Sequence, residues 1–64
     1  MRAVLLKNVK KGEVFKLRPT EKATVWIRDD YYREDKVYQY YSAYDVNRWG
    51  FNKGTRIVYV GFEW

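Results

Sequence analysis

Residues 14–28 read VFKLRPTEKATVWIR, and this pattern predicts a β-hairpin. Apolar and polar side chains alternate over residues 14–18 and again over residues 23–28. Such alternation is typical of strands that have one buried and one exposed face. Pro19 cannot donate a hydrogen bond to a strand ladder, so the loop of this hairpin is expected to begin there and to span residues 19–23.

The register of the hairpin determines which of its side chains face outward. Directly opposite residues share a face, so Phe15 is expected opposite Ile27, and Leu17 opposite Val25, on the buried side. This register places Trp26 on the exposed side. The residues expected beside this tryptophan are the cations Lys16, Arg18 and Arg28.

Three further strands are expected outside the hairpin. Residues 3–9 are apolar, residues 36–41 are rich in tyrosine, and residues 57–64 alternate in hydrophobicity. Residues 10–12, KKG, and residues 53–55, KGT, are typical turn sequences. The chain is therefore expected to contain five short strands.

Two connecting segments carry their own signals. Residues 29–35 hold four acids, one base and two tyrosines, which favours a polar hairpin tip. Residues 43–49 follow Ser42, a capping residue with an acid three positions later, and Gly50 is expected to end a short helical turn there. The inner side of that turn is predicted to consist of Ala43, Val46 and Trp49.

A chain of 64 residues is expected to form a single domain, residues 1–64, because a second hydrophobic core would not fit. Five short strands bury their side chains best as a small, partly open β-barrel, so the predicted fold class is all-β. Trp49 and Trp64 are expected to pack in the core or at a barrel end. The predicted core consists of Val4, Leu6, Phe15, Leu17, Val25, Ile27, Val58, Val60 and Phe62.

Two segments resemble a known class of small barrel. Residues 6–17, LKNVKKGEVFKL, resemble the opening of small bacterial and phage SH3-like β-barrel domains, in which an apolar residue, a glycine turn and an aromatic strand residue begin the barrel. Residues 54–60, GTRIVYV, are similar to the closing strand of those domains. The resemblance implies an SH3-like fold. It implies no single function, because such barrels serve nucleic-acid, peptide and structural roles alike.

The residue types that the chain lacks argue against several functions. There is no Cys and no His, which excludes disulfides, Cys/His zinc sites and imidazole catalysis. Clustered carboxylates occur only in residues 29–35, and the single serine, Ser42, has no base to activate it. We therefore expect no enzymatic activity, no metal and no cofactor. The apolar run near the N-terminus, residues 3–6, is too short for a secretory signal, and the longest apolar run, residues 57–62, is too short for a bilayer span. A cytoplasmic protein without a membrane partner is therefore expected.

Positive charge is concentrated in the first half of the chain. Residues 1–28 carry eight bases and two acids, whereas residues 29–35 carry a net negative charge. Basic side chains attract phosphates and an exposed tryptophan stacks on bases, so weak, salt-sensitive nucleic-acid binding is the first functional hypothesis. The predicted nucleic-acid-binding residues are Lys10, Lys11, Lys16, Arg18, Trp26 and Arg28.

A protein or peptide partner is the alternative hypothesis, either bound directly or within a larger complex. Exposed tyrosines beside acids form grooves that hold extended basic peptides. The predicted residues of such a groove are Asp29, Asp30, Tyr31, Tyr32, Glu34 and Asp35. An exposed edge strand rich in Tyr and Val leaves both a monomer and a weak homodimer open.

Overall fold

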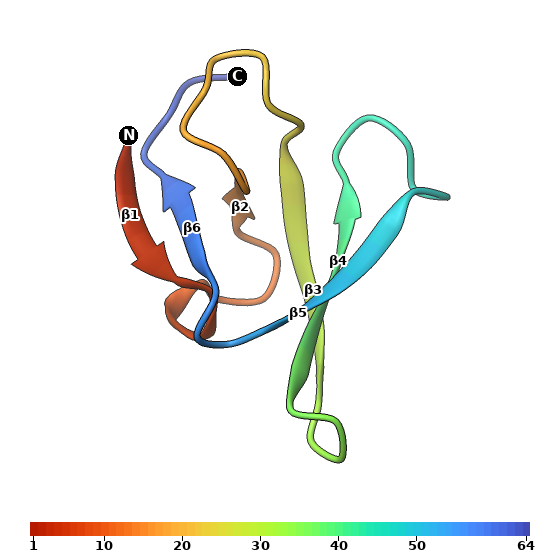
Figure 1. Cartoon of the computed structure of the whole chain (residues 1–64). Helices are drawn as coiled ribbons and strands as arrows, with labels where there is room; N and C mark the ends of the chain where they lie inside the picture. Colours follow the sequence, from red (N-terminus) through yellow and green to blue (C-terminus); the bar gives the residue numbers. More distant parts are fainter.

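The computed structural model describes residues 1–64 and contains six β-strands and one turn of 3-10 helix (Figure 1). The elements in chain order are β1 (Arg2–Leu5), η1 (Leu6–Asn8), β2 (Val14–Phe15), β3 (Trp26–Tyr32), β4 (Val37–Ser42), β5 (Trp49–Lys53) and β6 (Ile57–Val60). The predicted all-β fold class is confirmed.

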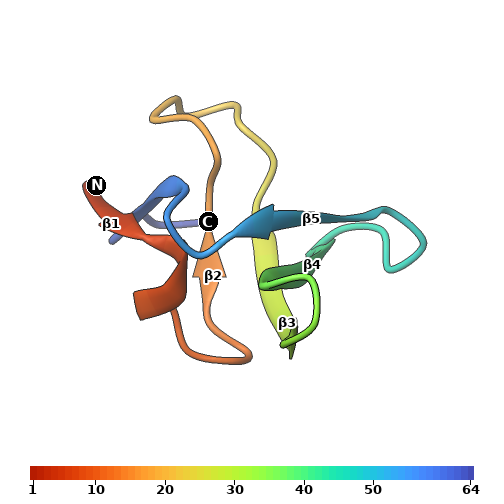
Figure 2. The same cartoon turned by 60° about the horizontal axis from the view of Figure 1, so that its bottom comes forward.

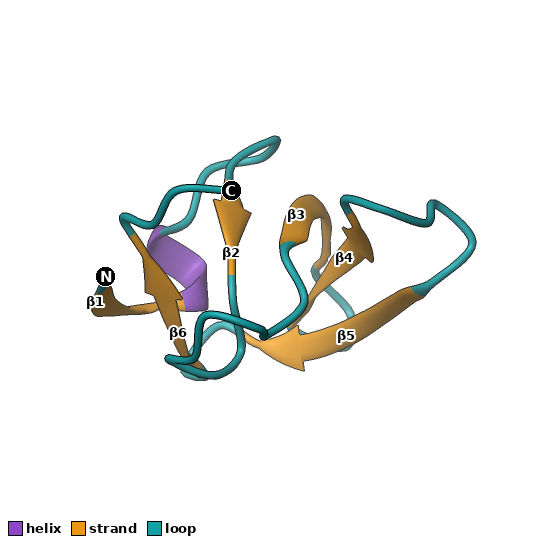
Figure 3. Cartoon of the chain, turned by 90° about the horizontal axis from the view of Figure 1, so that it is seen from above, coloured by secondary structure: helices purple, strands orange, loops and turns teal.

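The strands form two antiparallel sheets, which a single bridge connects. One sheet pairs β1 with β6, and the other has the order β2-β3-β4-β5. At the bridge, Lys16 and Tyr59 exchange two backbone hydrogen bonds of 2.9 Å. A second connection joins η1 to the turn after β5, where the Lys7 N–H donates a hydrogen bond to the Gly54 carbonyl at 3.1 Å. Figure 3 shows β1 and β6 on one side of β2, with the other strands opposite, in a partly open β-barrel.

The core lies between the two sheets and is built around an aromatic contact. Phe15 and Tyr40 pack edge to face, with ring centroids 5.3 Å apart. Leu6 of η1 and Val58 of β6 pack in the same core cluster as these two rings. The buried apolar residues are Leu6, Val9, Phe15, Val25, Tyr40 and Val58.

The predicted core agrees in part with the observed one. Leu6, Phe15, Val25 and Val58 are buried as expected, and Val4, Leu17 and Val60 are partly buried against the core. Ile27 and Phe62 are only half-buried. Trp49 and Trp64 are 56% and 62% exposed, so neither of them packs in the core.

The register of the β2–β3 pair differs from the predicted register by one residue. Phe15 lies opposite Trp26, and Val14 lies opposite Ile27. Because side chains alternate along a strand, a slip of one residue exchanges the two faces. Trp26 therefore faces the barrel interior, where it packs against the core, instead of standing on the outer face.

The cause of the slip lies in the connection between these strands. The chain does not turn back within residues 19–23 but forms a wide loop over residues 16–25, which arches above β2 and β3 in Figure 2. Lys16 fastens this loop from below, because its Nζ donates to the carbonyl oxygens of Thr20 and Glu21 at 3.1 and 3.0 Å. The predicted exposure of Lys16 is therefore wrong.

Lys16 is 3% exposed, although a lysine between the apolar residues Phe15 and Leu17 of a strand is expected to face the solvent. Besides its two carbonyl partners, Nζ lies 4.7 Å from the ring centroid of Phe62. Hydrogen bonds and a ring face replace the water that the ammonium loses on burial. The alternation pattern treats any charged residue as exposed, which is why it predicts the wrong environment for Lys16.

Residues 43–48 form bends and a turn, so the predicted helical turn at residues 43–49 is absent. The Asp45 carbonyl accepts a hydrogen bond from the Arg48 N–H at 2.9 Å, and the Asp45 Oδ1 accepts one from the Asn47 N–H at 3.0 Å. Trp49 then begins β5, which raises the number of strands from the predicted five to six.

The predicted boundaries of the other elements also shift. β3 continues to Tyr32 through a bulge between Arg28 and Tyr31, so only residues 33–36 form the hairpin tip. In Figure 1 this hairpin projects beyond the barrel. At the N-terminus, β1 ends at Leu5 and the chain enters η1 instead of continuing as a strand.

Candidate functional site

A groove of about 390 Å³ opens between the loop over residues 16–25, the start of β3 and the connection from β4 to β5. We call it the Trp26 groove. Its lining includes three cationic side chains and no acidic one. The lining residues are Leu17, Arg18, Lys22, Ala23, Thr24, Trp26 and Arg48.

The core fixes the position of the Trp26 ring. The ring packs against Tyr40 with centroids 5.0 Å apart and an interplanar angle of 71°. Arg48 lies on the groove side, with its guanidinium carbon 5.9 Å from the Trp26 ring centroid. Trp26 is half-buried, so part of an aromatic ring that the core already holds in place is open to a ligand.

The cations of the Trp26 groove are not neutralised by the protein. The ion pair that the structure contains joins Lys11 to Asp30, elsewhere in the molecule. Arg18, Lys22 and Arg48 are exposed and have no carboxylate within ion-pair distance. The groove therefore combines a fixed aromatic surface with three available positive charges, which suits a ligand that is both anionic and planar.

The structure brings together only part of the predicted basic set. Arg18 and Trp26 share the groove, but Lys16 is buried in the loop above β2. Arg28 lies half-buried on another part of β3, with its guanidinium carbon 4.6 Å from the Tyr38 ring centroid. Lys10 is exposed in the turn before β2 and does not line the groove.

Lys11 is engaged by Asp30 and stands outside the groove. Its Nζ donates to the Asp30 Oδ1 at 2.6 Å. This hydrogen bond, together with the nearby negative charge, holds the pKa of Lys11 above its ordinary value. The pair ties the turn before β2 to the bulge in β3, which is a structural use of both residues.

Sequence reasoning missed the other two cationic lining residues, Lys22 and Arg48. Lys22 lies in the loop over residues 16–25, and Arg48 immediately precedes β5. Neither residue belongs to a strand with a readable alternation. Their positions depend on the buried ammonium of Lys16 and on the unexpected strand β5, so only the three-dimensional structure brings them to Trp26.

The acidic, tyrosine-rich set does not form one groove. Tyr31 packs against Tyr38 on one face of the hairpin, with ring centroids 4.6 Å apart. Tyr32 lies on the other face, where its hydroxyl donates to the Gln39 Oε1 at 2.7 Å. Asp29 is half-buried at the bulge, Asp30 binds Lys11, and Glu34 and Asp35 are exposed at the tip. The predicted tyrosines therefore cannot grip one peptide together.

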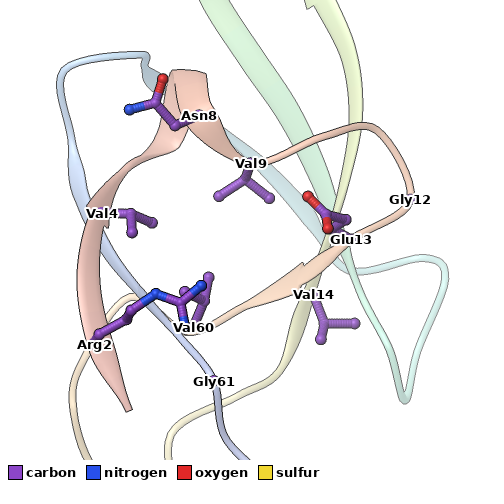
Figure 4. A pocket seen from close by; sticks show the side chains of 9 residues that line it. All are labelled: Arg2, Val4, Asn8, Val9, Gly12, Glu13, Val14, Val60 and Gly61. Atoms are coloured by element: carbon purple, nitrogen blue, oxygen red, sulfur yellow. The ribbon is translucent and has the colours of Figure 1, made fainter.

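A larger cavity, of about 440 Å³, lies between β1, η1 and the turn that leads into β2 (Figure 4). Valines make up its apolar part, and one arginine and one glutamate balance each other in charge. The lining residues are Arg2, Val4, Asn8, Val9, Gly12, Glu13, Val14, Val60 and Gly61. With no net charge and no aromatic ring, this cavity indicates no particular ligand.

Other kinds of site find no support in the side-chain arrangement. The structure contains no group of three or more acidic residues placed to hold a metal ion. None of its helical segments is long and apolar enough to cross a bilayer. No protein-family model, curated protein or solved structure matches the chain. Function must therefore be inferred from the residues of the molecule itself.

Proposed function

We propose that this protein is a non-enzymatic binding module that binds single-stranded nucleic acid weakly through the Trp26 groove. The observation that carries the proposal is a half-buried tryptophan, held by the core, beside three cations that have no acidic partner. Stacking of one base on an aromatic side chain contributes about 1–3 kcal/mol. The cations add an attraction for phosphates that depends on salt but not on sequence.

A single strand suits this groove better than a duplex. Trp26 lies within a concave surface, and only one part of its ring is open. A base that stacks there must leave its own helical stack, which an unpaired strand permits at low cost. One stacked base and three cations correspond to weak binding, with a Kd on the order of 10⁻⁴ to 10⁻⁶ M.

The SH3-like assignment of the barrel is part of the same proposal. Six short strands, one 3-10 turn and a partly open barrel are compatible with that class. The likeness of residues 6–17 to bacterial and phage domains of this type supports it. Barrels of this class include nucleic-acid-binding members, although the fold alone does not specify a ligand.

Fluorescence anisotropy of labelled single-stranded and double-stranded oligonucleotides tests the proposed function. Arg48→Gln removes a groove charge from an exposed position, and Lys10→Gln removes one from an exposed position outside the groove. We expect saturable single-strand binding that Arg48→Gln weakens about fivefold at low salt, while Lys10→Gln has little effect. Equal losses in the two variants, or no binding at low salt, would contradict the proposal.

A further inference from the structure

A second cationic cavity, of about 270 Å³, lies near the other end of β3, where the β3–β4 hairpin meets η1 and the turn after β5. We call it the lysine cavity. It shares no residue with the Trp26 groove. Its lining residues are Lys7, Tyr31, Lys36, Tyr38, Lys53, Gly54 and Thr55.

Three separate parts of the chain supply the lysines of this cavity. Lys7 comes from η1, Lys36 from the hairpin tip and Lys53 from the end of β5. No acidic residue lines the cavity, and none of the three lysines takes part in an ion pair. The fold therefore gathers three positive charges that repel one another, with no negative charge of its own to offset them.

Lys36 lies at the tip of the β3–β4 hairpin and has an unusual backbone conformation. Lys36 has a φ of 55° and is the one residue other than glycine with a positive φ. Side chains with a Cβ are unfavourable in this left-handed conformation, where glycine or asparagine is usual. The ammonium of Lys36 makes no hydrogen bond or ion pair within the protein. This conformation closes the tip of the β3–β4 hairpin over residues 33–36, and the Lys36 ammonium stays available to a ligand.

Gly54 allows the walls of the cavity to come together. A Cβ at this position would lie 2.8 Å from the Tyr38 Cε1 and 2.9 Å from the Lys7 Cβ, which is too close for real contacts. Tyr38 in turn packs against Tyr31, with the rings tilted by 40°. The lysines therefore lie beside a pair of aromatic rings.

We propose that the lysine cavity binds a nucleoside phosphate monoester, either free or at the end of a nucleic-acid strand. A phosphate monoester carries nearly two negative charges at neutral pH, which suits three lysines better than the single charge of a phosphodiester. Lysine ammonium groups bind phosphate as point charges. Tyr31, the exposed ring of the tyrosine pair, offers an aromatic surface for the base, whereas Tyr38 is covered by Tyr31 and Arg28.

Nuclear magnetic resonance titrations with adenosine 5′-monophosphate, inorganic phosphate and adenosine test this proposal. We expect the monophosphate to shift the backbone amides of Lys7, Lys36, Gly54 and Thr55. Inorganic phosphate should shift the same amides at higher concentration, and adenosine should not shift them. Equal affinity for adenosine and its monophosphate, or shifts located elsewhere in the molecule, would overturn the proposal.

Lys36→Gly separates the role of the side chain from that of the backbone. The variant removes the ammonium and places glycine where the backbone favours it, so the melting temperature should rise. Affinity for adenosine 5′-monophosphate should fall by about fivefold or more. Lys10→Gln is the matched control and should leave this affinity unchanged. Unchanged affinity in Lys36→Gly would overturn the proposal.

Oligonucleotides of one sequence, with and without a 5′-phosphate, distinguish the two sources of the phosphate monoester. Tighter binding of the phosphorylated strand that Lys36→Gly abolishes would support the strand end as the ligand. Binding of the free monophosphate with no such preference would support a free nucleotide. Arg48→Gln should weaken binding of the unphosphorylated strand and leave binding of adenosine 5′-monophosphate unchanged. Failure of the proposal for the Trp26 groove is therefore distinguishable from failure of the proposal for the lysine cavity.

Discussion

The Trp26 groove and the lysine cavity are both cationic and aromatic, but they differ in which component the fold holds in place. In the groove, the Trp26 ring is fixed by Tyr40 while the cations stand on exposed connections. In the lysine cavity, three exposed lysines come together around Gly54, which allows Lys7 and Tyr38 to approach each other, and the open ring is that of Tyr31. We therefore expect base stacking to dominate recognition in the groove and charge to dominate it in the cavity.

Replacement of Trp26 should have the largest effect, because this ring belongs to both the core and the groove. We expect Trp26→Ala to lower the free energy of unfolding by about 2–4 kcal/mol, as measured by urea denaturation. Trp26→Phe retains an edge-to-face partner for Tyr40 and should fold at a smaller cost while still losing single-strand affinity. If Trp26→Ala were as stable as the wild type, the inner placement of Trp26 would be wrong.

Lys16 supports the groove without lining it. Lys16→Ala leaves the carbonyls of Thr20 and Glu21 without their buried partner, and should cost about 2–3 kcal/mol in the free energy of unfolding. It should also weaken single-strand binding, because the loop that Lys16 fastens carries Arg18 and Lys22. Adenosine 5′-monophosphate binding should be unchanged in the folded protein. Equal losses of affinity for a single strand and for adenosine 5′-monophosphate would contradict the assignment of these ligands to two separate sites.

Gly54 offers the converse test for the lysine cavity. Gly54→Ala introduces a methyl group against Tyr38 and Lys7, and should cost about 1–3 kcal/mol in the free energy of unfolding. The same substitution should reduce binding of adenosine 5′-monophosphate more than binding of an unphosphorylated strand. Chemical denaturation and parallel titrations measure the two effects. A greater loss for the strand would reverse the assignment of the sites.

The smallest effect is expected in the salt dependence of strand binding. Three phosphate contacts predict a slope of about −2 for the logarithm of the affinity against the logarithm of the salt concentration. Arg48→Gln should bring this slope to about −1.4, since each contact contributes about −0.7 for a single strand. Anisotropy titrations at several salt concentrations provide the slope. An unchanged slope in the variant would mean that Arg48 contacts no phosphate.

Most strands were predictable because their pattern is local. The alternation in residues 14–15, 26–28 and 57–60 indicates strand conformation without reference to the rest of the chain, although in residues 26–28 it assigned the wrong face to the interior. β5, with the sequence WGFNK, lacks this local signal. Its strand conformation depends on β4, where the Tyr40 hydroxyl accepts a hydrogen bond from the Asn52 Nδ2 at 2.7 Å.

The candidate site was less predictable than the fold. Arg18 and Trp26 were both expected in it, but Trp26 was expected on the outer face of the sheet and instead packs against the core. The error comes from the β2–β3 register, in which Phe15 lies opposite Trp26 and not opposite Ile27. The burial of Lys16 was missed as well, because a buried ammonium has the same sequence signature as an exposed one. Lys22 and Arg48 reach the groove only through the connections that Lys16 and β5 position. Contacts between residues so far apart in the sequence produce no hydrophobic periodicity from which they could be predicted.

The central claim, that Trp26 receives a base, is tested most directly by the indole N–H resonances of the three tryptophans. Trp49 and Trp64 are more than half exposed and lie outside the groove, so they serve as internal controls for nonspecific stacking. On titration with a short unphosphorylated oligothymidine, we expect the Trp26 indole resonance to shift saturably, together with the amides of Arg18 and Arg48. Shifts confined to Trp49 or Trp64 would contradict the claim.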